Sequence, residues 1–469
     1  MMTGYDFSAP FTFGVATAAY QIEGAAAEGG RGPSIWDTFS HTPGRTLGDD
    51  TGDVACDHYH RFASDIALMA ELGVDAYRMS ISWPRVQPEG TGRLNPEGIA
   101  FYRRVLTMLR EHGIRPVVTL YHWDLPQPLQ DAGGWTVRET AAAFARYAAA
   151  MAREFGDLAV DWTTLNAPWC TAFLGHCSGV HAPGVTDPAT SLLVAHHLNL
   201  AHGMAIARIR GELGSRARCS VALNLHVTRP ADPDDPADVA AAERIGTLGN
   251  DVFLAPMLEG RLPDALVAAT SALTDWSFVT DGDLAVIHQP LDLLGVNYYS
   301  SNVVRRRRAT DPRNSGGHGD TGVSPWPGCD DITFLDPAGP LTAMGWNIDP
   351  DALTELLVGL GRRFPGLPLM ITENGAAFPD GADAEGRVED VERIGYLEQH
   401  LAAVGRARQS GTDVRGYFLW SLLDNFEWSW GYTRRFGIVH VDYRTLRRTP
   451  KASFAWYRDV IGSRVLTID

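Results

Sequence analysis

The chain has 469 residues, 45% of them hydrophobic, and a formal net charge of −16 at pH 7. This acidic balance argues against a nucleic-acid partner, because such a partner requires a basic surface. The sequence has five scattered cysteines, no apolar stretch of membrane-spanning length and no signal-peptide pattern at its amino terminus, so we expect a cytoplasmic protein that does not cross a membrane.

Short apolar runs alternate with helical segments along the whole chain. We predict strands at residues 13–16, 76–80, 116–122, 162–166, 220–224, 293–299, 369–373 and 416–420, with helices between them, for example at 62–72, 99–112 and 137–155. This alternation is typical of a closed (β/α)8 (TIM) barrel. A doubly wound open sheet is the alternative, but no GxGxxG follows the first strand. We therefore predict an α/β fold in which residues 1–469 form a single (β/α)8 domain.

Three long segments rich in Gly, Pro and Asp interrupt the pattern, at residues 31–57, 229–238 and 305–343. We interpret them as loops that shape the mouth of a pocket. Four consecutive arginines at 305–308 lie in one of these segments and are expected to form a solvated loop, not a polyanion site. Cys170 is expected to be an ordinary buried thiol.

Polar or aromatic side chains lie at or just past the carboxyl ends of several predicted strands, namely Arg78, His122, Asn166, Asn297 with Tyr299, Glu373 and Trp420. In barrel enzymes this is the face on which several strands together build the active site. A glutamate such as Glu373 is costly at the end of a buried strand unless it has a function. Arg78 could neutralise Asp75 or Glu71, but its strand-end position favours a pair with Glu373.

Six motifs follow one another along the chain: FGVATAAYQIEG (13–24), YRMSISW (77–83), YHWDLP (121–126), NYY (297–299), ITENG (371–375) and WSLLDNFEW (420–428). Through these motifs the chain resembles the family 1 glycoside hydrolases of the β-glucosidase group, nearly from end to end. The resemblance implies a retaining enzyme that acts on β-linked glucosides, with galactosides and fucosides as further candidate substrates. It implies no metal and no cofactor.

The resemblance also implies roles for individual residues. Glu373 would be the nucleophile that forms a covalent glycosyl-enzyme, and Arg78, Asn297 and Tyr299 would complete the catalytic set. Asn166 would bond the sugar 2-hydroxyl, and Trp420 would lie under the sugar ring. The other implied substrate-binding residues are Gln21, His122, Trp123, Glu427 and Trp428, with Trp169, Trp346 and Phe436 toward the mouth of the pocket.

One position departs from the family pattern. The family's fourth strand ends in Asn-Glu-Pro, whereas this chain has Asn166-Ala167-Pro168. The glutamate serves first as general acid and then as general base, and alanine can do neither. Hydrolysis of unactivated glycosides should therefore fall by about 10²–10⁴-fold. Activated donors and small external nucleophiles should remain usable.

Three explanations of Ala167 are compatible with the sequence. The alanine is an introduced substitution that removes the acid/base residue, or the chain is a natural pseudoenzyme that binds sugars without cleaving them. A third explanation is kinship with a branch that cleaves thioglucosides, although that branch carries glutamine at this position. We favour the introduced substitution, because the other functional positions match the family. The sequence does not predict the oligomeric state.

Overall fold

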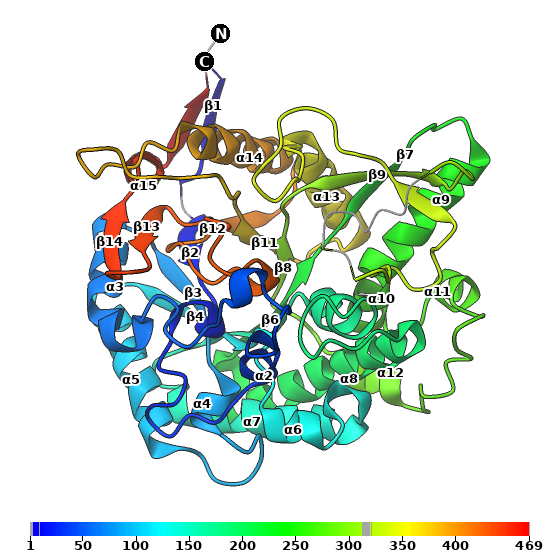
Figure 1. Cartoon of the computed structure of the whole chain (residues 1–469), viewed down its shortest axis with the longest axis horizontal. Coiled ribbons are helices and arrows are strands. Elements are labelled where there is room, and N and C mark those ends of the chain that lie inside the picture. Colours follow the sequence, from blue (N-terminus) through cyan, green and yellow to red (C-terminus); the bar gives the residue numbers. More distant parts are fainter. Residues whose placement is uncertain (1–2, 9, 312–318, 320, 469) are drawn as a thin grey trace.

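The computed structural model describes residues 3–8, 10–311, 319 and 321–468. Its centre is a closed barrel of eight parallel strands (Figure 1), in the order β11-β12-β2-β3-β4-β5-β6-β8. These strands are β2 (Thr12–Ala16), β3 (Ala76–Ser80), β4 (Arg115–Tyr121), β5 (Asp161–Asn166), β6 (Arg218–Asn224), β8 (Leu293–Asn297), β11 (Leu369–Asn374) and β12 (Val414–Trp420). The predicted barrel is confirmed, and the predicted strand limits differ from the observed ones by two residues at most.

Helices surround the barrel (Figure 1). The longer ones are α3 (His58–Leu72), α5 (Pro96–Glu111), α7 (Arg138–Phe155), α8 (Pro188–Leu213), α9 (Pro236–Gly246), α13 (Pro350–Arg363), α14 (Val391–Gln409) and α15 (Ala452–Ser463). The shorter ones are α1 (Ala19–Ile22), α2 (Ile35–Ser40), α4 (Trp83–Val86), α6 (Gln127–Asp131), α10 (Val252–Leu254), α11 (Asp264–Ala269) and α12 (Asp283–Ile287). The predicted helices 62–72, 99–112 and 137–155 correspond to α3, α5 and α7. Helix α5 begins earlier than predicted because the Asn95 side chain caps its first turn and Pro96 fits that turn.

The barrel strands are buried on both faces, because helices cover them outside and side chains fill the interior. Every residue of β3, β5 and β11 is buried. The charged residues at the strand ends are buried too, with Arg78 1% and Glu373 5% exposed. A charge at this depth is costly unless a partner compensates it, so these strand ends must interact with one another.

The three segments that we predicted as loops all contain regular structure. The first contains α2, and the other two contribute to a three-stranded sheet outside the barrel, formed by β7 (Val227–Pro230), β9 (Ser301–Arg306) and β10 (Ile332–Phe334). The arginine run is therefore not entirely a loop, since Arg305 and Arg306 lie in β9, and Arg305 forms an ion pair with Asp311. Composition does not reveal this sheet, because β9 pairs with segments far from it along the chain. Residues 312–318 and 320 of the predicted 305–343 loop lie outside the described residues.

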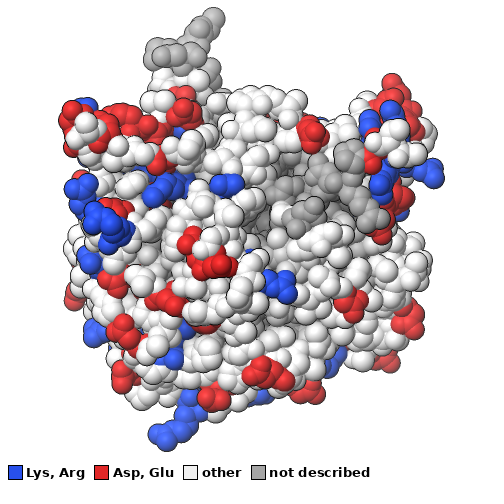
Figure 2. Space-filling model, in the orientation of Figure 1, with Lys and Arg blue, Asp and Glu red and all other residues white. Residues whose placement is uncertain are grey.

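The two ends of the described chain lie side by side, where β1 (Thr3–Asp6) pairs with β15 (Val465–Ile468) and projects from the body (Figure 1). A second antiparallel pair, β13 (Val439–Asp442) and β14 (Arg447–Pro450), follows the last barrel strand. Within the described residues no helix has both the length and the apolar character needed to cross a membrane. Acidic and basic side chains are interspersed on the face shown in Figure 2.

Candidate active site

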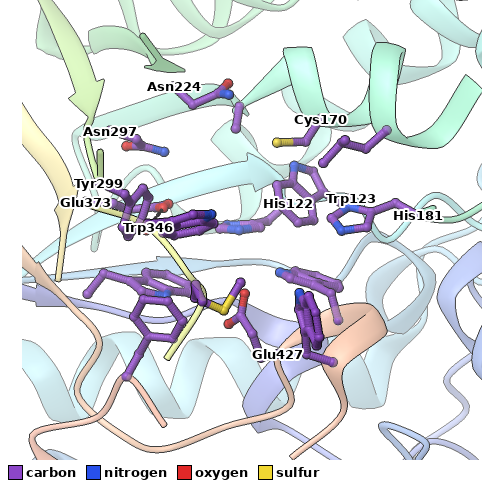
Figure 3. Close-up of a pocket in the computed structure, with 17 residues that line it drawn as sticks. His122, Trp123, Cys170, His181, Asn224, Asn297, Tyr299, Trp346, Glu373 and Glu427 are labelled. Atoms are coloured by element: carbon purple, nitrogen blue, oxygen red, sulfur yellow. Dashed lines mark hydrogen bonds between the residues drawn. The ribbon is translucent and has the colours of Figure 1, made fainter. Parts of the chain in front are cut away.

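A pocket lies at the carboxyl ends of the barrel strands, and Glu373 is in its wall (Figure 3). The lining residues are His122, Trp123, Ala167, Cys170, Leu174, His181, Asn224, Asn297, Tyr299, Met344, Trp346, Glu373, Trp420, Glu427, Trp428, Trp430 and Phe436. Most of the predicted site residues are among them. Gln21, Arg78 and Asn166 lie just behind the lining and form hydrogen bonds with it.

The Glu373 carboxylate has a partner on each oxygen. Arg78 Nη1 donates to Oε1 at 2.7 Å, and Tyr299 Oη donates to Oε2 at 2.6 Å. Arg78 therefore pairs with Glu373, whereas Asp75 pairs with Arg464. Burial, and next the negative charge of Glu373, hold the pKa of Tyr299 well above its ordinary range, so the phenol keeps the proton that it donates. Both contacts orient the carboxylate and compensate its charge.

The Asn166 amide connects three further strand ends. Its Oδ1 accepts from Arg78 Nη2 at 2.6 Å and from Asn297 Nδ2 at 2.9 Å. Its Nδ2 lies 3.0 Å from His122 Nε2. Because an amide nitrogen can only donate, Nε2 must accept, and the ring proton of His122 is on Nδ1. The network thus sets the tautomer of His122 as well as the orientation of Asn166.

Among the described residues, the buried polar atoms at the pocket that have no partner include His122 Nδ1 and Gln21 Oε1. Burial, together with the positive charge of Arg78, keeps the pKa of His122 well below its ordinary value, so the ring is neutral. Its Nδ1–H is then a donor, and Gln21 Oε1 is an acceptor. Buried polar atoms are rarely left unsatisfied, so His122 Nδ1 and Gln21 Oε1 each have hydrogen-bonding capacity that a ligand or a water molecule would satisfy.

Glu427 supplies a second carboxyl group to the pocket. Gln21 Nε2 lies 3.4 Å from Glu427 Oε2 and also donates to Asn425 Oδ1 at 3.0 Å and to Phe426 O at 2.9 Å. Burial and the negative charge of Glu373 raise the pKa of Glu427 to about 8. At neutral pH Glu427 is therefore mostly protonated and can donate a hydrogen bond as well as accept one.

Aromatic rings form much of the remaining wall. The rings of Trp123 and Trp428 lie 4.5 Å apart between centroids, and those of Tyr299 and Trp346 lie 5.6 Å apart. Trp123 and Trp428 both adopt a positive φ, 79° and 49° respectively. This conformation is costly for bulky residues and is concentrated at functional sites. Trp420, at the end of β12, and Phe436 line the pocket as well.

Ala167 follows β5 directly and lines the pocket with a φ of 42°. Its backbone N–H donates to Ala222 O at 2.8 Å. Cys170 and Leu174 belong to the π-helical turn η3 (Cys170–Leu174) and line the same part of the wall. Cys170 thus differs from the ordinary buried thiol that we expected (Figure 3). Burial and the carboxyl groups of Glu373 and Glu427 raise the pKa of Cys170, so this thiol keeps its proton.

Trp169 lies apart from the lining residues. It is fully buried, and its ring packs against those of Trp326, His226 and Phe173 at centroid distances of 4.9, 4.8 and 5.7 Å. Ala167, Trp169 and Cys170 are close in sequence, but successive side chains of a helical turn point in different directions. The turn therefore directs Cys170 to the pocket and Trp169 into the core.

Six lining residues are missing from the sequence prediction, namely Cys170, Leu174, His181, Asn224, Met344 and Trp430. Asn224 ends a predicted strand, so the same strand-end pattern could have identified it. Trp430 ends a 3-10 helical turn (Trp428–Trp430) directly after the last motif, so its nearness to Trp428 could have identified it. The other four lie in loops or in the turn after β5, and no spacing in the sequence marks them.

A partnered carboxylate among hydrogen-bonding and aromatic groups, at this end of a (β/α)8 barrel, corresponds to one of the two carboxyl groups that a glycoside hydrolase uses. Comparison with known families agrees, because the chain belongs to Glycosyl hydrolase family 1, which it matches over residues 4–465. In the described part of the chain, no group of three or more His, Cys, Asp or Glu side chains is placed to hold a metal ion.

Several characterised proteins are similar to this chain. The bifunctional β-D-glucosidase/β-D-fucosidase of Bifidobacterium breve is 52% identical over 465 residues, which cover 97% of this chain and 98% of the relative. The structure of a psychrophilic β-glucosidase from Micrococcus antarcticus has a TM-score of 0.93 and 46% identity over 97% of both chains. A family 1 β-glucosidase from Thermotoga maritima in complex with isofagomine lactam has a TM-score of 0.91 and 41% identity, covering 99% of this chain and 100% of that one.

Proposed function

We propose that this protein is a retaining β-glycosidase of the β-glucosidase type, in which Glu373 attacks the anomeric carbon to form a glycosyl-enzyme. The observation that carries the proposal is the Glu373 carboxylate in the pocket wall, held by Arg78 at 2.7 Å and by Tyr299 at 2.6 Å. A carboxylate that is charge-compensated, oriented and accessible to a ligand has the properties of a nucleophile. We further propose that residues 1–469 act as one catalytic domain.

The proposed substrates are β-glycosides with glucose in the deep part of the pocket, and β-fucosides as a second group. The relatives support glucose and fucose as the sugars, because one is named a β-D-glucosidase/β-D-fucosidase and another a β-glucosidase. His122, Gln21 and Glu427 offer donors and acceptors to the sugar hydroxyls, and Asn166 has a second amide proton for the 2-hydroxyl. Trp420 offers an apolar ring face to the sugar C–H groups, and Trp123 and Trp428 complete the polar end of the pocket.

Ala167 occupies the position at which we infer that a retaining enzyme needs its acid/base carboxyl. Family resemblance supports this, and so does the place of Ala167 in the lining of the pocket that contains Glu373. Without a general acid, a leaving group must depart unprotonated, so only activated glycosides should react at a useful rate. Without a general base, water attacks the glycosyl-enzyme slowly, and the intermediate should accumulate.

A pre-steady-state burst tests the proposal. Mixing the protein with 2,4-dinitrophenyl β-D-glucoside should release one equivalent of phenolate quickly and then very little. Azide needs no general base, so it should restart turnover and give β-glucosyl azide. The mass of the protein should rise by one glucosyl unit during the burst, on a peptide that contains Glu373.

The second candidate function is sugar binding without chemistry, and Ala167 is the observation that favours it. Binding of isofagomine lactam with neither burst nor azide product would establish this alternative and overturn the enzymatic proposal. The burst is expected to be the same whether the alanine was introduced or is natural. The experiment therefore distinguishes the catalytic function from sugar binding alone, and does not reveal the origin of Ala167.

A further inference from the structure

Lys451 is the only lysine of a chain that has 39 arginines. Its side chain is fully buried, at the start of α15, just past the end of β14. Arginine occupies other buried cationic positions, such as Arg78 and Arg393. The two groups differ in shape, because an ammonium is a compact charge with tetrahedral donors, whereas a guanidinium is a planar fork. A single exception to such a strong preference suggests that the geometry at position 451 requires an ammonium.

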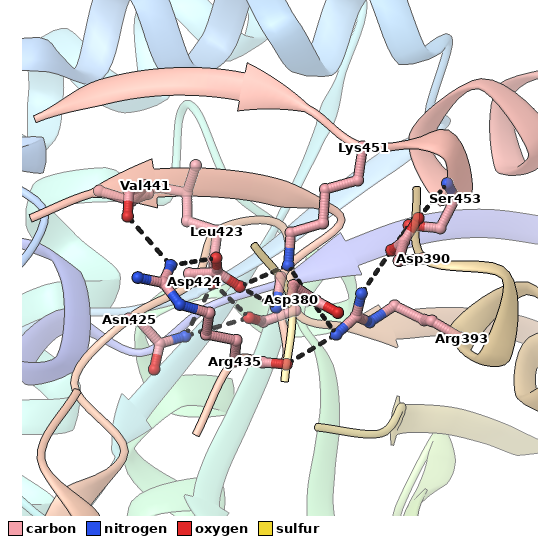
Figure 4. A network of polar contacts seen from close by, with 12 residues as sticks. Asp380, Asp390, Arg393, Leu423, Asp424, Asn425, Arg435, Val441, Lys451 and Ser453 are labelled. Atoms are coloured by element: carbon pink, nitrogen blue, oxygen red, sulfur yellow. Dashed lines mark hydrogen bonds and ion pairs between the residues drawn. The ribbon is translucent and has the colours of Figure 1, made fainter. Parts of the chain in front are cut away.

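Lys451 connects the two loops that follow the last two barrel strands (Figure 4). We call residues 375–390, after β11, the β11 loop, and residues 421–438, after β12, the β12 loop. Lys451 Nζ lies 2.5 Å from Asp380 Oδ2 in the β11 loop and 2.8 Å from Asp424 Oδ1 in the β12 loop. The strand before the β11 loop ends with Glu373 and Asn374, and the β12 loop carries Glu427.

The surrounding network balances its charges. Three carboxylates face three cations, and all six side chains are buried except that of Arg435, which is 20% exposed. The carboxylates are Asp380, Asp390 and Asp424, and the cations are Arg393, Arg435 and Lys451. Burial alone would raise the pKa of Asp424, but the positive charges of Lys451, Arg435 and Arg393 outweigh it and lower that pKa. Asp424 is thus a carboxylate, and removal of the Lys451 charge would leave an uncompensated negative charge in the interior.

Asp424 holds the two ends of the β12 loop together. Its Oδ1 accepts from the Gly437 backbone at 3.0 Å, and its Oδ2 accepts from Arg435 Nη1 at 2.7 Å. Asp424 also precedes Asn425, Phe426 and Glu427, the three residues that contact the Gln21 amide. A shift of Asp424 would therefore be transmitted to Glu427 and Gln21.

We propose that Lys451 is a positioning residue, whose ammonium sets the distance between the hydroxyl-binding pair Glu427 and Gln21 on one side and Glu373 on the other. The inference rests on the proposed function, because it assigns Glu427 and Gln21 to the sugar hydroxyls. Glu373 keeps its own partners Arg78 and Tyr299, which come from other strands. Loss of the ammonium should therefore weaken sugar binding more than it slows attack by Glu373.

The test compares Lys451→Met with Lys451→Arg and Asp380→Asn. Arg138→Met is the matched control, since it deprives the buried Asp283 of its arginine without touching either loop. Burst kinetics at varied donor concentration give a dissociation constant and a glycosylation rate constant for each variant. Two donors are used, 2,4-dinitrophenyl β-D-glucoside and its 6-deoxy analogue. The analogue lacks the 6-hydroxyl, and the family resemblance implies that Glu427 holds the 4- and 6-hydroxyls.

Lys451→Met should raise the dissociation constant of the glucoside by roughly ten- to a hundredfold, because the loss of one or two hydrogen bonds from displaced Glu427 and Gln21 has effects of that size. The dissociation constant of the 6-deoxyglucoside should rise less than that of the glucoside. For both donors the glycosylation rate constant should change less than the dissociation constant. Lys451→Arg should restore the melting temperature more than it restores binding. Arg138→Met should lower the melting temperature and leave the binding of both donors unchanged.

The inference would be overturned if a folded Lys451→Met variant lost the same factor in affinity for both donors. Unchanged affinity in that variant would overturn it as well. If Lys451→Met does not fold, Asp380→Asn tests the same link with the same two donors, because it removes the charge that Lys451 meets in the β11 loop, together with that of the Asp380–Arg393 pair. A missing burst in the unmodified chain would overturn the proposed function instead. The binding of isofagomine lactam, measured by calorimetry in the same variants, would then decide the role of Lys451.

Discussion

Two walls of the pocket differ in the polar and ionisable groups that they contain. The Glu373 wall, which we define as Glu373 and Tyr299 with Arg78 directly behind them, gives each carboxylate oxygen a charged or phenolic donor within 2.7 Å. The Ala167 wall, formed by Ala167, Cys170 and Leu174, contains a methyl group, a protonated thiol and an alkyl chain. One wall is built to hold a negative charge, and the other has no group that exchanges a proton near neutral pH.

Under the proposed mechanism, the difference implies that the groups for covalent attack and those for proton transfer are structurally separate. The side chain at position 167 has no hydrogen bond through which it could support the Glu373 wall, whose contacts come from β3, from β11 and from the residue two positions past β8. The orientation of Glu373 therefore does not depend on a carboxyl group at position 167. Covalent attack and sugar binding can persist where proton transfer is missing.

Removal of the Glu373 carboxylate should have the largest effect. In Glu373→Gln the side chain keeps its size but loses its charge, so the glycosylation rate constant should fall by roughly 10⁴-fold or more, as for other catalytic nucleophiles. Stopped-flow release of dinitrophenolate measures it, and the melting temperature controls for folding. A burst of normal size in this variant would show that the nucleophile lies elsewhere.

Ala167→Glu should give the Ala167 wall a group that can transfer a proton. Hydrolysis of an unactivated donor such as cellobiose should rise by about 10²–10⁴-fold, the usual contribution of general acid–base help. The burst rate with the dinitrophenyl glucoside should change much less, because that leaving group needs no proton. Ala167→Gln is the control of equal size that cannot transfer a proton. Similar gains for Glu and Gln would refute the assigned role.

The same substitution should reduce stability. Ala167→Glu adds a carboxyl group to a pocket that already contains Glu373 and Glu427. Catalytic groups are often placed at the expense of stability, so the melting temperature should be lower than that of the unmodified chain. Differential scanning calorimetry checks this, and Ala167→Gln should show a smaller decrease because it adds no charge.

Tyr299→Phe tests the contribution of one hydrogen bond in the Glu373 wall. It removes the 2.6 Å hydrogen bond to Oε2, and a hydrogen bond to a charged group contributes about 1.5–3 kcal/mol. The glycosylation rate constant should therefore fall by roughly ten- to a hundredfold. Trp169→Phe is a matched aromatic change outside the pocket, and it should leave that rate constant nearly unchanged. A comparable loss in both variants would mean that packing, not the hydrogen bond, is responsible.

The smallest expected effect concerns the pH dependence of stability. The pKa of Glu427 is raised from an ordinary 4.5 to about 8, so between these pH values the folded protein keeps a proton that the unfolded chain releases. Stability from this group therefore falls as the pH rises through that range. Glu427→Gln removes the effect, and its gain in melting temperature should be larger at pH 9 than at pH 5 by roughly 1–3 °C. An equal gain at both pH values would contradict the raised pKa.

The strand-end pattern of the sequence located much of the site. Arg78, His122, Asn166 and Glu373 were placed at strand ends, and the closed barrel brings them together. The family resemblance, and not the strand-end pattern, implied Trp169, whereas the structure has Cys170 in the pocket lining. Neither line of reasoning could predict this difference, because the turn after β5 decides the direction of each side chain. The family resemblance, and not spacing, supplied Gln21, Glu427 and Trp428.

The sequence by itself determined the alternation of eight strands with helices, the family, and the absence of a carboxyl group at position 167. These properties are local, since they depend on periodicity, motifs and residue identity. Only the tertiary structure decided the partners of Glu373, the proton position on His122, the raised pKa of Glu427 and the link from Lys451 to both loops. Those properties depend on distances and burial between residues far apart in the chain, and the fold alone sets them.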